Sequence, residues 1–157
     1  MSVDPSPSPD LREHVRSSRG RRMPRVLVVD DDAAMRAMAR HLLERAGYAV
    51  AEAKSGREGL ARLRGDPLPD YLVADLRMAD GSGGWLVAQV AYEFPALITR
   101  AVVITAAAAS AAAAHLSARW GCPVVAKPYT GAELVETIVG LEDAQTVSPR
   151  TPPLPAS

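Results

Sequence analysis

Short apolar runs recur along the middle of the chain, and polar residues interrupt each of them at its carboxyl end. The first run is almost wholly Val and Leu and stops at three consecutive aspartates. Continuous apolar runs of this length are typical of strands buried on both faces of a sheet. We therefore predict five strands, over Arg25–Val29, Tyr48–Ala53, Tyr71–Ala74, Ala101–Ile104 and Pro123–Ala126.

Between these runs the apolar spacing changes to that of helices. In Ala33–Ala46, Met35, Met38, Leu42 and Leu43 lie at helical spacing and suggest core packing, and Gly47 follows as a C-cap. Three further helices are predicted by pattern and one by alanine content, over Arg57–Leu63, Trp85–Phe94, Gly131–Leu141 and the alanine-rich 107–119. Five alternations of strand and helix predict a single α/β domain, a parallel sheet with five helices distributed over both faces.

The two ends of the chain differ in composition from this core. Residues 1–23 are rich in Pro and Arg, and 143–157 are rich in Pro, so we expect disordered tails around a folded domain at 24–142. The Arg-rich stretch could contact RNA, DNA or an acidic partner. A solvated tail is the interpretation we favour.

Charge and cysteine content narrow the function. Lys and Arg number 18, as do Asp and Glu, so no global basicity indicates nucleic-acid binding. The one cysteine, Cys122, excludes an internal disulfide and suits a reducing cytoplasm, and no flanking His suggests a reactive thiol. No apolar run approaches the ~20 residues that span a bilayer, so no membrane association is expected.

The polar residues at the strand ends are the candidate functional residues. Asp30 and Asp31 follow the first strand, Asp75 the third, Thr105 the fourth and Lys127 the fifth. In an open parallel sheet these ends meet at one edge, where ligands bind. Clustered carboxylates repel unless a cation relieves them, and Mg²⁺ takes carboxylate and phosphate oxygens. A carboxylate can itself accept a phosphoryl group, with a hydroxyl and a lysine to neutralise charge.

The sequence resembles the receiver domains of two-component response regulators. The matching motifs are VLVVDDD (26–32), DLRMADG (75–81), VVIT (102–105) and VAKPY (125–129). Asp31 and Asp75 are 44 residues apart, Thr105 follows after 30 and Lys127 after 22, as in that family. The resemblance implies a (βα)5, doubly wound, flavodoxin-like fold.

The resemblance also implies roles at the acidic end of the pocket. Asp75 would be the phosphoacceptor, and Asp30, Asp31 and Asp75 would hold Mg²⁺ together with the backbone carbonyl of Arg77. The donor would be a phosphohistidine on a histidine kinase or a phosphotransfer protein.

At the opposite side of the pocket, Thr105, the Ala106 backbone N–H and Lys127 would contact the phosphoryl group. A cis bond before Pro128 would aim Lys127 inward.

The chain departs from the family where the signal is passed outward. Ala79 replaces the usual proline, and Val124 replaces the usual aromatic switch residue. Thr105, Val124 and Tyr129 are the switch candidates, with Trp120 as a further one. Residues 106–114 are alanines and one serine, which would make the output surface bland.

Three functions follow as hypotheses. The first is a phosphoacceptor that is not an enzyme in its own right, without an output domain, acting on an unknown downstream protein, with a phosphorylation-dependent homodimer left open. For this hypothesis, the sequence is most similar to stand-alone receivers and to receivers appended to hybrid sensor kinases. The second is a Mg²⁺-dependent phosphatase with Asp30 as nucleophile, because Asp30 and Asp32 form a D-x-D pair. The third is an interaction module that keeps only the fold.

Overall fold

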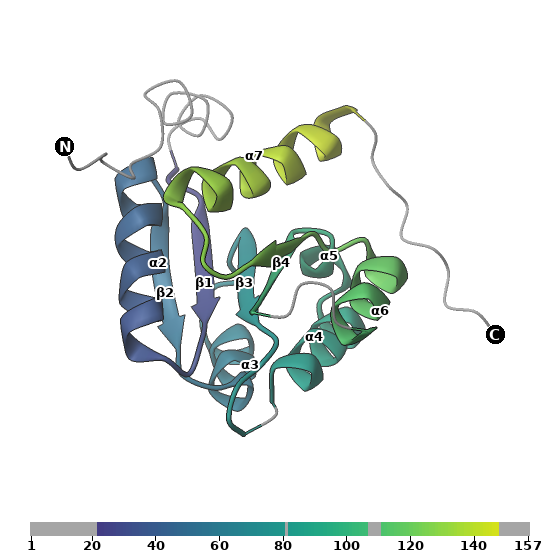
Figure 1. Cartoon of the computed structure of the whole chain (residues 1–157). Helices are drawn as coiled ribbons and strands as arrows, with labels where there is room; N and C mark the ends of the chain where they lie inside the picture. Colours follow the sequence, from purple (N-terminus) through teal and green to yellow (C-terminus); the bar gives the residue numbers. More distant parts are fainter. Residues whose placement is uncertain (1–21, 81, 107–110, 148–157) are drawn as a thin grey trace.

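A computed structural model describes residues 22–80, 82–106 and 111–147 (Figure 1). The predicted tails therefore lie outside the described residues, apart from a few positions beside the domain. So do residues 107–110 of the predicted alanine-rich helix and Gly81 of the motif at 75–81. Among the described residues the chain forms one sheet with helices packed on it.

The sheet consists of five parallel strands. They are β1 (Arg25–Val29), β2 (Ala49–Ala53), β3 (Tyr71–Asp75), β4 (Ala101–Thr105) and β5 (Val124–Ala126), in the order β2-β1-β3-β4-β5. The prediction of a five-stranded parallel sheet is confirmed. The strand order places β1 and β3 side by side at the centre, where the direction of winding reverses.

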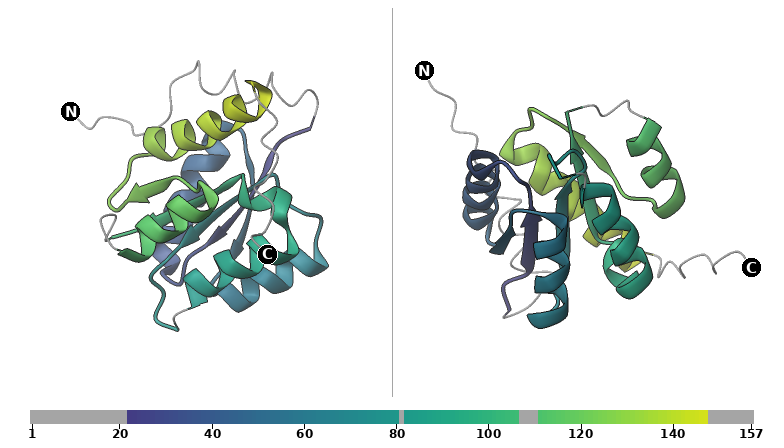
Figure 2. Two further views of the ribbon diagram at one scale, coloured as in Figure 1. Left: turned by 90° about the vertical axis from the view of Figure 1, so that its right-hand side faces the viewer. Right: turned by 90° about the horizontal axis from the view of Figure 1, so that it is seen from below.

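Six helices cover the sheet in the described part of the chain. They are α2 (Ala33–Ala46), α3 (Gly56–Gly65), α4 (Ser82–Glu93), α5 (Pro95–Ile98), α6 (Ala111–Trp120) and α7 (Gly131–Val147). Helices α2 and α7 lie on one face of the sheet, and α3 to α6 lie on the other (Figures 1 and 2). The doubly wound fold is thus confirmed.

Each face of the sheet has its own hydrophobic core. Alternate β1 side chains divide between them, since Val26 and Val28 pack with α2 and α7, whereas Leu27 and Val29 pack with α3, α4 and α6. Strands β3 and β4 are buried throughout and β1 is buried from Val26 onward, which explains why these sequences are apolar without alternation. In α2 the core positions are Ala39, Leu42, Leu43 and Ala46. Met35 packs partly against this core, but Met38 is exposed, so its predicted role as core filling is wrong.

The end of α2 has the geometry that its sequence predicts. Gly47 adopts a left-handed conformation with φ 104°, which a residue with a Cβ would tolerate poorly. Its N–H donates to the Glu44 carbonyl and the Tyr48 N–H donates to the Leu43 carbonyl, both within 3.1 Å. This pattern stops the helix and directs the chain into β2.

Several helix boundaries differ from the prediction. Helix α4 begins at Ser82 rather than at the predicted Trp85, and Gly83 and Gly84 lie within it. Helix α7 continues past Leu141 to Val147, so 143–147 are not part of a disordered tail. The short α5, which begins at Pro95 and buries Leu97 and Ile98, was not predicted, so the described helices number six and not five.

Candidate functional site

The two buried carboxylates come from the two central strands. Asp30 follows β1 and Asp75 ends β3, and the parallel pairing of Val29 with Ala74 brings both to the same edge. Their residues are only 5% and 4% exposed. Asp31 is exposed, but one carboxylate oxygen from each of Asp30, Asp31 and Asp75 can be chosen so that all three lie within 4.8 Å of one another.

A backbone N–H donates to each of these carboxylates. Asp30 Oδ1 accepts from the Asp32 N–H at 2.9 Å and Asp75 Oδ1 accepts from the Arg77 N–H at 3.0 Å. Asp31 Oδ2 accepts from the Ala79 N–H at 2.7 Å. The loops after β1 and β3 therefore fix the orientation of the carboxylates and join the two strand ends.

Lys127 supplies the positive charge of the pocket. Its Nζ donates to Asp75 Oδ2 at 2.9 Å and to Asp30 Oδ2 at 3.2 Å. The Lys127 backbone N–H donates to the Thr105 carbonyl at 3.1 Å, and the peptide bond to Pro128 is cis. The sequence prediction that Lys127 meets Asp75, and that a cis bond precedes Pro128, is confirmed.

Burial and charge act against each other on these groups. Burial raises the pKa of Asp30, and the nearby Asp75 charge raises it further. The hydrogen bond from the Asp32 N–H and the Lys127 charge lower it, but the net effect is an increase in the pKa. For Lys127, burial alone would lower the pKa, but the hydrogen bonds and charges of Asp75 and Asp30 outweigh it and raise the pKa. Lys127 is therefore a cation at neutral pH.

Thr105 and Arg77 line a second pocket. Thr105 is fully buried at the end of β4. It lines a pocket of about 310 Å³ with Leu76, Arg77, Gly84, Ala112, His115 and Leu116. Ala106, the next residue after β4, is exposed.

The switch candidates occupy different environments. Val124 is half-buried at the start of β5 and pairs with Val103. Tyr129 is buried in the core on the α2 and α7 side, and this burial, with the Asp30 charge, raises its pKa to about 12. Trp120 packs against the other core, with the Arg119 guanidinium 5.1 Å from its ring. Their role in switching stays a prediction.

Asp32 does not join the cluster of carboxylates that Asp30, Asp31 and Asp75 form. Its side chain caps α2, where Oδ1 accepts from the Ala34 N–H at 2.9 Å and from the Met35 N–H at 3.3 Å. This use of Asp32 as an N-cap removes the second carboxylate that a D-x-D phosphatase pair requires.

Two residues around the pocket were missed from the sequence. Arg36 of α2 donates from Nη1 to the Asp30 carbonyl at 2.7 Å. Gly83 packs so closely on the end of β3 that a Cβ there would lie 2.3 Å from the Asp75 carbonyl oxygen. The position of Arg36, one turn into the helix that follows the aspartates, does not by itself distinguish it from a solvent-exposed arginine.

Two histidines, a tryptophan and the cysteine could in principle bind a ligand, but they take structural positions. His41 and His115 are exposed, and the described residues contain no cluster that joins either to another metal ligand. Trp85 is 39% exposed with the Arg57 guanidinium 5.5 Å from its ring. Cys122 is buried and unpaired by disulfide. No helix in the described ranges is long and apolar enough to cross a bilayer.

The fold is a doubly wound α/β domain, and its site is an acidic pocket with a lysine at the carboxyl edge of the sheet. Comparison with known proteins identifies the family. Residues 26–139 match the response regulator receiver domain, so the chain belongs to that family. Among curated relatives, the acid tolerance regulatory protein ActR of Rhizobium meliloti is 43% identical over 58 residues. That match covers 37% of this chain and 29% of ActR, so the chain spans under a third of this relative.

Solved structures agree with the family and the fold. A CheY-like receiver domain protein from Methanospirillum hungatei has a TM-score of 0.72 and 27% identity, covering 80% of this chain and 98% of that one. A response regulator from Burkholderia pseudomallei has a TM-score of 0.65 and 26% identity, covering 79% of this chain and 72% of that one. The latter structure contains a phosphorylated aspartic acid and a calcium ion.

Proposed function

We propose that this chain is the phosphoacceptor of a two-component phosphorelay and that Asp75 receives the phosphoryl group. One observation carries the proposal: the Asp75 carboxylate is buried beside two further carboxylates, with the Lys127 ammonium 2.9 Å away. The phosphorylated aspartic acid in the similar Burkholderia protein supports it. Receiver domains in general are signalling proteins that accept a phosphoryl group from histidine kinases or phosphotransfer proteins.

In the proposed reaction, an Asp75 carboxylate oxygen attacks the phosphorus of a phosphohistidine. A P–O bond forms while the P–N bond breaks, and its electron pair returns to the imidazole of the donor. Lys127 balances the charge on the phosphoryl oxygens, and the Thr105 hydroxyl and the Ala106 N–H donate hydrogen bonds to them. The signal then passes to a downstream protein by a change in protein contacts.

Mg²⁺ is the proposed cofactor, and the donor set fits it. Asp30, Asp31 and Asp75 offer hard oxygen ligands at one place, and the Arg77 carbonyl is the proposed fourth protein ligand. Bound Mg²⁺ would neutralise the negative charge that accumulates when phosphate meets these carboxylates. The buried free Cys122 suits the cytoplasm, which is the compartment we propose.

Incubation with acetyl phosphate tests the proposal without requiring a kinase. We expect the wild-type chain to gain one phosphoryl group by intact mass, only when Mg²⁺ is present, with the modification mapping to Asp75. Asp75→Asn should show none, while circular dichroism confirms that it is folded.

Two results would contradict the proposal. Modification of Asp30 instead of Asp75 would favour the aspartate-nucleophile phosphatase. A folded wild-type chain that neither binds Mg²⁺ nor becomes phosphorylated would leave the interaction module as the function.

A further inference from the structure

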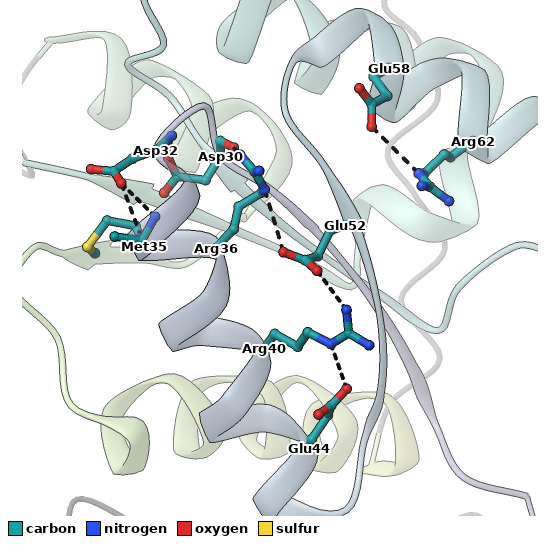
Figure 3. Close-up of polar contacts among 10 residues, drawn as sticks. Asp30, Asp32, Met35, Arg36, Arg40, Glu44, Glu52, Glu58 and Arg62 are labelled. Atoms are coloured by element: carbon teal, nitrogen blue, oxygen red, sulfur yellow. Dashed lines mark hydrogen bonds and ion pairs between the residues drawn. The ribbon is translucent and has the colours of Figure 1, made fainter.

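Arg36 connects helix α2 to the backbone of the acidic pocket. Its Nη1 donates to the carbonyl oxygen of Asp30 at 2.7 Å. Figure 3 shows the Arg36 side chain extending from α2 toward Asp30. The residue is largely buried, with 18% of its side chain exposed. An arginine in this helix would ordinarily extend into solvent, so its inward course needs an explanation.

The bond from Arg36 falls on the peptide unit that joins Asp30 and Asp31, the two proposed metal ligands that follow β1. The carbonyl that Arg36 holds belongs to the peptide between Asp30 and Asp31. The preceding peptide unit is held as well, because the Asp30 N–H donates to the Ala53 carbonyl of β2 at 3.1 Å. A rotation of the Asp30–Asp31 peptide would redirect both carboxylates at once, so a strong donor on its carbonyl fixes both.

Charged neighbours hold the Arg36 guanidinium itself in place. Its Nε lies 3.6 Å from Glu52 Oε1, and Glu52 Oε2 accepts from Arg40 Nη1 at 2.8 Å. Arg40 Nε in turn donates to Glu44 Oε1 at 2.8 Å (Figure 3). The guanidinium of Arg36 is thus oriented from β2 before any cation binds.

We propose that Arg36 is a positioning residue that sets the Mg²⁺ affinity of the pocket by holding the Asp30–Asp31 peptide. The inference rests on the proposed metal site and adds to it a residue that touches neither the metal nor the phosphoryl group. Its role resembles that of the outer partners that orient metal ligands elsewhere, whose loss weakens binding by about 10-fold or more.

The sign of the effect separates positioning from simple charge. Removing a cation near an acidic pocket favours binding of another cation, so an electrostatic role predicts that Arg36→Met binds Mg²⁺ more tightly. Positioning predicts the opposite. Arg40→Met removes the same charge one turn along α2 together with a contact to the other oxygen of Glu52. It leaves both the ion pair between Arg36 and Glu52 and the bond to the Asp30 carbonyl in place, which makes it the matched control.

The experiment is calorimetric titration of the metal-free full chain with MgCl₂, for wild type, Arg36→Met, Arg36→Lys and Arg40→Met. We expect the Kd of Arg36→Met to rise about 10-fold, and that of Arg40→Met to stay within about twofold of wild type. Arg36→Lys keeps the charge without the planar fork and should also bind more weakly than wild type. Thermal unfolding of each variant separates loss of affinity from loss of fold, and Arg36→Lys carries the test if Arg36→Met does not fold.

Unchanged or tighter Mg²⁺ binding by a folded Arg36→Met or Arg36→Lys would overturn the inference while leaving the proposed function intact. Equal weakening in Arg40→Met would overturn it as well, because the effect would then belong to the whole charged group. If the wild type itself failed to bind Mg²⁺, the proposed metal site would fall and the inference with it.

Discussion

At the scale of single residues, the pocket carries an excess of negative charge that the protein only partly neutralises. Asp30, Asp31 and Asp75 contribute three negative charges and Lys127 one positive charge, which leaves a formal charge of −2. Burial and the proximity of Asp75 are already unfavourable for the Asp30 carboxylate, since they contribute to raising its pKa. A divalent cation is the ligand that balances this charge, and this electrostatic reason is independent of the family.

Cys122 gives a residue-scale prediction about pH. Burial raises the pKa of its thiol to about 11, against an ordinary value of 9.0, and its Sγ lies 3.7 Å from the Ile98 carbonyl. The folded thiol holds its proton more tightly than the unfolded one, so the contribution of the protonated thiol to the free energy of unfolding is fully present below about pH 9. The free energy of unfolding should then fall as the pH rises from about 9 to 11.

Alkylation by iodoacetamide at pH 8 tests how strongly the fold protects the Cys122 thiol. We expect almost no labelling of the native chain and rapid labelling in urea, because the thiol is both protonated and inaccessible. Cys122→Ser, titrated in parallel, should lose the decline in stability that belongs to the thiol. Native labelling as fast as that of the unfolded chain would contradict the prediction.

At the scale of elements, the end of β3 and the start of α4 are joined more tightly than the glycine-rich sequence suggests. A Cβ at Gly83 would lie 2.3 Å from the Asp75 carbonyl oxygen and 2.6 Å from that of Leu76. The same helix carries Gly84, where a Cβ would meet nothing within 4 Å. Position 83 therefore has no room for a side chain, whereas the adjacent position 84 does.

We predict that Gly83→Ala destabilises the fold by about 2–3 kcal/mol, since the backbone of α4 must move away from β3. Gly84→Ala should be neutral or stabilising by up to about 1 kcal/mol, because alanine favours the helix. Urea unfolding measures both. Phosphorylation by acetyl phosphate should also be slower in Gly83→Ala, because the shift displaces the backbone of the proposed phosphoacceptor. Equal free energies of unfolding for the two variants would contradict the prediction, because they would show that α4 can move away from β3 without loss of stability.

The same scale shows which elements a sequence can predict. Strands β1, β3 and β4 were found because both faces are buried, so their apolar runs end sharply at polar residues such as Asp75. Helix α5 was missed because four residues cannot show a helical period, although Pro95 at its start favours it. The start of α4 was predicted three residues too late because glycine is a poor helix former. Only the packing against β3 shows why residue 83 has to be glycine.

At the scale of the molecule, the site could be predicted further than its surroundings. Asp30, Asp31, Asp75 and Lys127 were assembled from the topology of a parallel sheet, which brings strand ends together whatever the details of packing. Arg36 could not be found in this way, because a helical arginine has the same sequence signature whether it points to solvent or to a carbonyl. The switch role of Val124 and Tyr129 stays a prediction, since it concerns a second state of the chain.

Folding of a fragment tests whether the described residues form the domain by themselves. Both hydrophobic cores draw their members from between Val26 and Leu141. We therefore expect a fragment of residues 22–147 to unfold cooperatively in urea with a free energy of unfolding within about 1 kcal/mol of the full chain, the range of peripheral contacts.

A fragment of residues 22–130 is the control, because it lacks α7. This helix buries Leu134, Val135 and Ile138 completely, and each such side chain contributes roughly 1.5–3 kcal/mol. Their combined loss of roughly 5–9 kcal/mol is comparable with the whole stability of an ordinary domain. The shorter fragment should show no cooperative transition by circular dichroism. If 22–147 were much less stable than the full chain, residues outside it would have to pack on the domain, and the proposed boundaries would be wrong.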